Sequence, residues 1–257
     1  MTTKVDEVNI GDDVVYKGKA IIGYIDILGF SNSISNNWDE KENNPLETVL
    51  AIKGKLAKAS VRDKIRVKKA NGEKKIDINI YSRIQTISDS FIISHPISEI
   101  NAFSLFSGLY NIAENILDLW KLIIQNNYTI RGSISFGEIY WNRDEIIGPA
   151  FIEAYRNEEQ CSRVSRVIVN SSCNMLIKKA QKSEFNVILN DHFVKDIDGY
   201  TILNPRKVFK NNVEKEQILD KLNTIKSQQT DVLIKEKYTP LINAMKLVNH
   251  TTELLDY

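Results

Sequence analysis

The stretch Tyr24–Phe30, with the sequence YIDILGF, decides the fold that this chain is expected to adopt. Its apolar residues are typical of a strand buried on both faces, and a glycine and a phenylalanine close that strand. Asp26 is thus a carboxylate at a buried strand end, where a charge is costly unless a cation meets it. Thr86–Phe91 (TISDSF) sets Asp89 among β-forming residues in a similar way. Two such aspartates predict a two-metal site that acts on a phosphoryl group.

Two arginines further along the chain, Arg131 and Arg156, are candidates for binding phosphate. A guanidinium presents a fixed fork of donors to phosphate oxygens and does not lose its charge. Together with the aspartates, they indicate a chain that holds a nucleoside triphosphate and lets its own sugar hydroxyl attack the α-phosphate. In the alternative interpretation, each arginine forms a structural ion pair with Glu138, Glu153 or Glu159.

The composition excludes several classes of protein. With 257 residues, 42% of them hydrophobic and 26% charged, the chain has the material for one large domain with or without an appendage. Its formal net charge of +1 provides no broad positive field, so we expect no nucleic-acid partner and only local binding of phosphate. The N-terminus lacks the pattern of a signal peptide, and no apolar run approaches the ~20 residues of a membrane span. We therefore expect a cytoplasmic protein without a membrane partner.

Apolar periodicity predicts an α+β domain on the split βαβ, or ferredoxin-like, plan. We expect a polar segment at 1–19, the domain at 20–204 and a helical C-terminal extension at 205–257, which folds back on its own domain or, less often, packs on a partner subunit. The predicted strands cover 20–28, 77–80, 84–94, 128–136, 139–141, 164–170 and 186–189, with a hairpin turn at Gly137-Glu138. The predicted helices cover 46–60, 100–125, 149–159, 172–182, 213–225 and 231–255.

Four motifs follow one another in an order that is typical of one enzyme family. They are YIDILGF (24–30), ISDS (87–90), RGSISFG (131–137) and GPAFIEAYR (148–156). Together they resemble the class III nucleotidyl cyclase catalytic domains, and among these the bacterial Pycsar pyrimidine cyclases of antiphage defence. The resemblance covers residues 20–204. It implies a cyclase that converts CTP or UTP into the 3′,5′-cyclic monophosphate and pyrophosphate, as a second messenger in antiphage defence.

The resemblance also implies the cofactors. In that family two divalent ions, Mg²⁺ or Mn²⁺, are bound at the positions of Asp26 and Asp89, and the backbone carbonyl of Ile27 completes the shell of one ion. In the family, one ion helps to activate the ribose 3′-hydroxyl and the other binds the triphosphate. Independently of the resemblance, a few oxygen ligands completed by phosphate suit Mg²⁺ or Mn²⁺.

The remaining polar roles are implied in the same way. Arg131 occupies the position of the triphosphate-binding arginine, and Arg156 that of the arginine which meets charge developing in the transition state. Lys195 is the nearest match by order to a late phosphate-binding lysine. The sequence departs from the family at Ile152, where an asparagine is usual, so the group that orients the ribose is left open.

Gln85 and Glu145 occupy the two positions that select the base in the family. The pair matches neither the lysine and aspartate of adenylate cyclases nor the glutamate and cysteine of guanylate cyclases. A glutamate accepts hydrogen bonds only, so it suits the amine of cytosine or the ring N–H of uracil. Tyr140 and Trp141 nearby favour a pocket for a single-ring base, and cytosine is preferred to uracil.

The family setting also implies partners. Its active sites form at a head-to-tail homodimer interface, and its product acts on a separate effector protein that senses the cyclic nucleotide. Two alternatives stay open: an adenylate or guanylate cyclase, and a catalytically degenerate cyclase fold kept as a nucleotide-binding protein, as Ile152 suggests.

Overall fold

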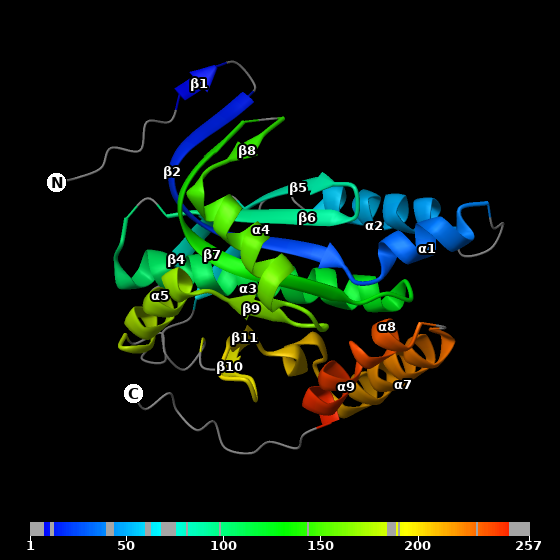
Figure 1. The fold of residues 1–257 in the computed structure, drawn as a ribbon. Helices are drawn as coiled ribbons and strands as arrows, with labels where there is room; N and C mark the ends of the chain where they lie inside the picture. Colours follow the sequence, from blue (N-terminus) through cyan, green and yellow to red (C-terminus); the bar gives the residue numbers. More distant parts are fainter. Residues whose placement is uncertain are drawn as a thin grey trace.

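Strand β2 (Asp13–Ile27) lies at the centre of the main sheet. It pairs antiparallel with β7 (Ile130–Trp141) on one side and with β6 (Ser90–Pro96) on the other, and β6 pairs with β5 (Arg83–Ile87). The order β7-β2-β6-β5, with helices between β2 and β5 and between β6 and β7, is the antiparallel split βαβ arrangement (Figure 1). The predicted α+β class and ferredoxin-like plan are confirmed.

A computed structural model provides these coordinates, and it describes residues 8–10, 13–39, 44–59, 63–67, 76–80, 82–97, 99–142, 144–183, 189, 191–229 and 231–246. The sheet continues beyond β7 through β9 (Val167–Val169), β11 (Thr201–Leu203) and β10 (Phe193–Lys195), while β1 (Val8–Ile10) pairs with β2 and β8 (Ile146–Ile147) with β7. A separate hairpin joins β3 (Asp63–Val67) and β4 (Ile76–Ile80). The helices are α1 (Phe30–Asn37), α2 (Pro45–Ala59), α3 (Ala102–Gln125), α4 (Pro149–Cys161), α5 (Ser171–Gln181), the 3₁₀ helix η1 (Pro205–Val208), α7 (Asn212–Gln228), α8 (Val232–Glu236) and α9 (Thr239–Lys246).

The two faces of the sheet carry two separate hydrophobic cores. Because side chains alternate along a strand, Ile21 and Ile25 of β2 face the larger core, which α2, α3, α5, α7 and α9 complete. Ala20 and Ile22 face the smaller core under α4. Asp26 shares the alternation of Ala20 and Ile22, so the fold directs it to the α4 face of the sheet. This alternation decides which helix borders the site.

Two predicted strands are wrong in detail. The predicted strand 84–94 is divided by a two-residue turn, Ser88-Asp89, in which Ser88 has a φ of 52°. Asp89 therefore lies in the turn of the β5–β6 hairpin and not inside a strand. The turn predicted at Gly137-Glu138 does not form, because β2 extends to Asp13 and pairs with β7 along its whole length, including Ala20 opposite Gly137. The chain reverses after β7 instead, since β8 pairs back with β7 and the Asn142 N–H donates to the Glu145 carbonyl over 3.0 Å.

The structure also differs from the sequence prediction in its helices. Helix α1 follows directly on Gly29 and was not predicted, since its residues carry few apolar side chains. The single helix predicted at 231–255 is broken into α8 and α9 at Lys237-Tyr238. Pro240 explains the break, because its ring would clash with the carbonyl of Glu236 in a continuous helix. The predicted strand 186–189 and the end of the last predicted helix fall outside the described residues, apart from Leu189.

The C-terminal helices pack on the domain itself. Leu222 of α7 and Met245 of α9 are fully buried in the larger core. Figure 1 shows α7, α8 and α9 stacked beside the end of the sheet at which β2 finishes. No helix in the described parts of the chain is both long enough and apolar enough to span a membrane.

Candidate active site

Asp26, Arg131 and Ser90 form one row across the end of the sheet. Asp26 lies opposite Arg131 of β7 and opposite Ser90 of β6, so the three side chains share the α4 face. Arg131 donates from Nε and from Nη2 to Oδ2 of Asp26, each over 3.2 Å. Ser90 Oγ donates to the other oxygen, Oδ1, over 3.2 Å. The strand pairing therefore brings together a carboxylate and an arginine that lie far apart in the sequence.

Helix α4 adds a third charged group, Glu158, which sequence reasoning missed. Its Oε1 lies 2.7 Å from Arg131 Nε, and the residue is only 3% exposed. This oxygen makes an ion pair but no well-aligned hydrogen bond, because the Nε–H of Arg131 is directed at Asp26. The available signal was the spacing of Ala150, Ala154 and Glu158, which places a carboxylate on the same helix face as two alanines buried against the sheet.

The site holds more negative than positive charge. Burial raises the pKa of Asp26 above its ordinary value, the charge of Asp89 raises it further, and Arg131 acts in the opposite direction. Burial raises the pKa of Glu158 to about 7, with Arg131 again opposing and Asp26 adding to the effect. Asp89, which lies in the β5–β6 turn, thus acts on Asp26 through its charge. Two carboxylates pair with one guanidinium and the charge of Asp89 acts on both of them, and such an arrangement attracts further cations.

A small pocket opens beside this row. It has a volume of about 260 Å³ and is lined by Asp26, Ile27 and Arg131 together with the loop that follows β2. The opposite wall comes from the C-terminal helices and consists of Asp231, Leu233, Ile234 and Lys237. The end of β2 therefore meets α8 across a space large enough for a phosphate group.

The donor set at this pocket fits a hard divalent cation. Asp26 lines the pocket with a carboxylate, and Ile27 reaches it at the strand end, where its carbonyl is the predicted ligand. Asp89 is not a lining residue, although its charge raises the pKa of Asp26. Mg²⁺ prefers a few oxygen ligands and keeps water or phosphate in its remaining positions. Among the described residues, no cluster of three or more His, Cys, Asp or Glu side chains has the arrangement of a metal site by itself. An ion here would depend on ligands from the substrate.

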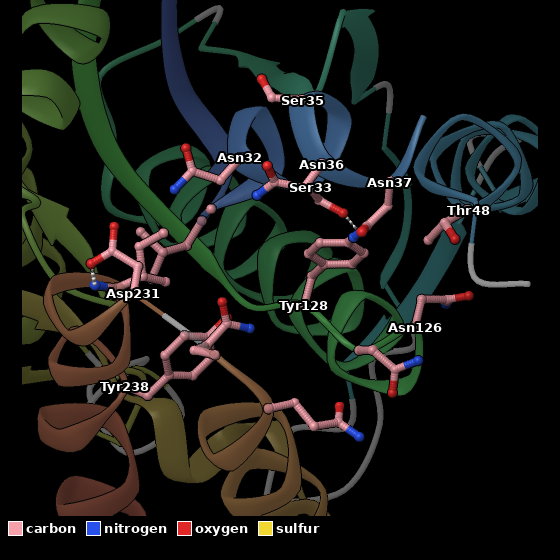
Figure 2. A pocket seen from close by; sticks show the side chains of 16 residues that line it. Asn32, Ser33, Ser35, Asn36, Asn37, Thr48, Asn126, Tyr128, Asp231 and Tyr238 are labelled. Atoms are coloured by element: carbon pink, nitrogen blue, oxygen red, sulfur yellow. Dashed lines mark hydrogen bonds between the residues drawn. The ribbon is translucent and has the colours of Figure 1, made fainter. Parts of the chain in front are cut away.

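A larger hollow of about 930 Å³ adjoins the pocket (Figure 2). The two share Leu28, Gly29, Asn32 and Asp231 as well as Ile234. Neutral amides and hydroxyls dominate its lining, which includes Asn32, Ser33, Ser35, Asn36, Asn37, Thr48, Asn126, Asn127, Tyr128, Gln228 and Gln229. The described lining residues include neither lysine nor arginine, so this hollow is not built for a phosphate group.

Arg156 is not brought to Asp26 within one chain. It is exposed on α4, two residues and therefore more than half a turn from the buried Glu158. Ile152 and Tyr155 are 46% and 44% exposed beside it. The ring of Tyr155 also contacts Tyr24 edge to face, at 5.3 Å between ring centres. These three residues form an outward surface of α4.

The two predicted base-selecting residues come close to one another. Gln85 Nε2 donates to the backbone carbonyl of Asp144 over 2.6 Å, next to the exposed Glu145. The other amide atom, Gln85 Oε1, is buried without a hydrogen-bond partner in the described structure. Trp141, the last residue of β7, is buried and stacks on Tyr16 at 4.5 Å between ring centres. It therefore packs in the smaller core.

Lys195 lies on β10, the edge strand, where its Nζ donates to the Gly199 carbonyl over 3.1 Å. Strands β11, β9 and β7 separate it from β2, so the structure does not bring it to Asp26 within one chain.

Comparison with known proteins finds similarity only among solved structures, since no protein-family model and no curated protein matches the sequence. A class III adenylyl cyclase-like ATP-binding protein from Pseudomonas aeruginosa is 13% identical with a TM-score of 0.47, over 81% of this chain and 44% of that one. The guanylyl cyclase Cya2 is 12% identical with a TM-score of 0.44, over 73% and 91% of the two chains. A bacterial light-regulated adenylyl cyclase is 13% identical with a TM-score of 0.40, over 87% and 57%.

This chain thus spans less than half of the length of the first of these proteins. At such scores and identities the likeness by itself carries no argument about activity, and the fold assignment rests on the strand order and register described above.

Proposed function

We propose that the protein is a nucleotidyl cyclase of the class III type, which converts CTP or UTP into the 3′,5′-cyclic monophosphate and pyrophosphate. The observation that carries the proposal is the charged row at the end of β2. There Asp26, with Asp89 close enough to raise its pKa, meets Arg131 at the mouth of a phosphate-sized pocket. The split βαβ order of the strands is the architecture that apolar periodicity predicted, and it is compatible with the family that the four motifs resemble.

In this proposal Asp26, Asp89 and the carbonyl of Ile27 hold two Mg²⁺ or Mn²⁺ ions. Ions bound there would stabilise the attacking and leaving oxygens of an in-line displacement. The ribose 3′-oxygen forms a bond to the α-phosphorus and loses its proton, while the bond to the β-phosphate oxygen breaks and pyrophosphate leaves.

Arg131 has the task of holding phosphate oxygens. In this structure its guanidinium pairs with Asp26 and with Glu158. Once a cation takes up the charge of Asp26, the Nη atoms become free for phosphate, while buried Glu158 keeps hold of the Nε side. Glu158 is thus a positioning residue for Arg131.

A homodimer supplies the remaining groups in this proposal. Arg156 is exposed on the outward surface of α4 and has no place near Asp26 of its own chain, which is what a residue acting on a partner's site requires. Gln85 and Glu145 would select the base. The expected role of the product in antiphage defence, through a separate effector protein, rests on the sequence resemblance alone.

One assay tests the activity. The purified protein is incubated with each of the four nucleoside triphosphates and Mn²⁺, and the products are identified by mass spectrometry. A cyclic pyrimidine nucleotide as the main product supports the proposal, whereas a cyclic purine nucleotide shows an adenylate or guanylate cyclase.

Variants of the two aspartates provide the residue-level test. Asp26→Ala and Asp89→Ala should each reduce turnover by about 100-fold or more, because each removes an ion that stabilises charge in the transition state. Asp220→Ala, at an exposed position on α7, serves as the matched control and should keep full activity. Full activity in either site variant would contradict the metal assignment.

The second candidate function is a nucleotide-binding protein without turnover. Ile152 favours it, because an exposed apolar side chain stands where the family uses a hydrogen-bonding asparagine. Binding of a triphosphate without any product, across a wide range of protein concentration, would select this candidate.

A further inference from the structure

Helix α8 forms one wall of both hollows beside the end of β2, and the two hollows differ in charge. The larger one is lined by neutral amides and hydroxyls with one carboxylate, Asp231. The smaller one is lined by two cations, Arg131 and Lys237, and by two carboxylates, Asp26 and the same Asp231. A phosphate group therefore finds positive partners only in the smaller pocket, and one of the two comes from the C-terminal extension.

Lys237 is held in place by its backbone rather than by its side chain. Its carbonyl accepts a hydrogen bond from the Ser165 N–H over 3.0 Å. Ser165 Oγ in turn donates to the carbonyl of Ile130 over 3.0 Å, and Ile130 is the residue before Arg131. Ser165 thus connects the end of α8 to the strand that carries Arg131. These two hydrogen bonds fix the backbone of Lys237 relative to the backbone next to Arg131.

Two buried side chains fix α8 on either side of this connection. Ile234 is 7% exposed and lies against Gly29, where a Cβ on the glycine would be 3.5 Å from Ile234 Cγ2. Tyr238, which follows Lys237, is 1% exposed in the larger core. Lys237 between them is half-buried. Because its neighbours are packed and its carbonyl is hydrogen-bonded, binding of a ligand would not have to order this backbone.

The two cations of the small pocket differ in whether they form ion pairs. Arg131 is in ion-pair contact with two carboxylates, Asp26 and Glu158. Lys237 forms no ion pair with any residue that the structure describes. Lys237 is therefore the cation of this pocket that has no ion-pair partner among the described residues, and an anionic ligand would supply one.

We propose that Lys237 binds the phosphate chain of the nucleotide, so that the C-terminal extension is part of the active site. The inference rests on the proposed function, because it takes the ligand of the pocket to be a nucleoside triphosphate. Lys237 contacts the terminal phosphates, which leave as pyrophosphate, from the wall opposite Asp26.

The test measures binding of inorganic triphosphate in the presence of Mn²⁺ by isothermal titration calorimetry, on the full chain. Lys237→Ala should weaken binding by about tenfold, because a charge-assisted contact is lost. Lys237→Arg should recover most of it. Lys235→Ala is the matched control, since Lys235 lies on the same helix outside the pocket lining and should bind as the wild type does. Circular dichroism checks that each variant is folded.

Asp26→Ala in the same titration separates the two proposals. If Asp26→Ala abolishes the Mn²⁺-dependent binding and Lys237→Ala binds like Lys235→Ala, the role of Lys237 is overturned and the cyclase proposal stands. If the wild-type chain does not bind triphosphate with Mn²⁺ at all, the cyclase proposal fails and the role of Lys237 fails with it. Loss of binding in both variants, with rescue by arginine, supports both.

Discussion

Arg131 lies between two carboxylates, the half-buried Asp26 and the buried Glu158, that differ in what they can do. Asp26 borders the pocket, whereas Glu158 is enclosed by α4 and the sheet. An ionised Glu158 has lost its water and gains only one ion pair, without an aligned hydrogen bond. Ionisation of Glu158 is therefore unfavourable for folding.

This balance predicts a pH dependence of stability. The pKa of Glu158 is raised to about 7 in the folded state from an ordinary value of 4.5. Between these two values the folded chain binds more protons than the unfolded chain, so the contribution of Glu158 to the free energy of unfolding falls as the pH rises. Glu158→Gln should lack this decline, and urea unfolding at pH 5, 6, 7 and 8 measures it. Parallel curves for variant and wild type would contradict the prediction.

The same substitution has a separate effect on function. Glu158→Gln leaves Arg131 without its buried anionic partner, so the guanidinium is less firmly positioned. In the proposed cyclase we expect the KM for the triphosphate to rise more than kcat falls, because Arg131 binds phosphate in the ground state as well as in the transition state.

Helix α4 can bring Glu158 to the sheet only because it begins very close to β7. Gly148, the N-cap of α4, has a φ of 152°, and a Cβ there would lie 2.5 Å from the Glu138 carbonyl oxygen. Ala150 and Ala154, the next buried residues on this helix face, keep the helix close to the strands. The helix start thus determines where the charged end of α4 lies.

Gly148→Ala should therefore destabilise the fold and displace α4 from the sheet. A clash with backbone atoms cannot be relieved by a rotamer change, so we expect a loss of about 1–3 kcal/mol in the free energy of unfolding, measured with urea. Gly54→Ala on α2 is the control, since its Cβ would meet no atom within 4 Å. That change should stabilise the helix by about 0.5–1 kcal/mol. Equal effects at both positions would show that the approach of α4 is not tight.

The C-terminal helices turn one face of the sheet into a closed core. Ile218, Leu222 and Ile225 of α7 belong to the same cluster as the apolar residues of β2 and α3. Because α8 is fixed by this packing, the pocket beside Asp26 has its second wall within the same chain. Arg156 is exposed on α4 and is not among the residues that line this pocket.

The dimer of the proposed function predicts complementation between two inactive variants. Co-expressed Asp26→Ala and Arg156→Ala chains form some heterodimers in which one site takes Asp26 from one chain and Arg156 from the other. That site is intact, so part of the activity should return, and a product assay on the co-purified mixture measures it. Each variant alone provides the control. If the mixture stays inactive, Asp26 and Arg156 do not act across an interface.

Much of this protein is determined by local sequence. Apolar periodicity placed α3 and α5 within two residues of their observed ends, because one helix face buried over many residues leaves a clear repeat. The proline after Gly148 predicted the start of α4. The motifs also indicated Asp26, Asp89 and Arg131 as partners in one site; the structure pairs Arg131 with Asp26 and places Asp89 where its charge raises the pKa of Asp26, while their joint role stays a prediction.

Other features depend on contacts between distant segments. Whether Gly137-Glu138 turns or continues a strand depends on how far β2 extends, which is a property of the pairing and not of the dipeptide. Glu158 has the sequence environment of a solvated helix residue, and only the packing of α4 makes it a buried anion. Lys237 lies more than one hundred residues from Arg131, and α8 places it in the same pocket. The chemistry of the strand ends follows from residue types, whereas the charge balance around them follows from burial, which only the folded chain decides.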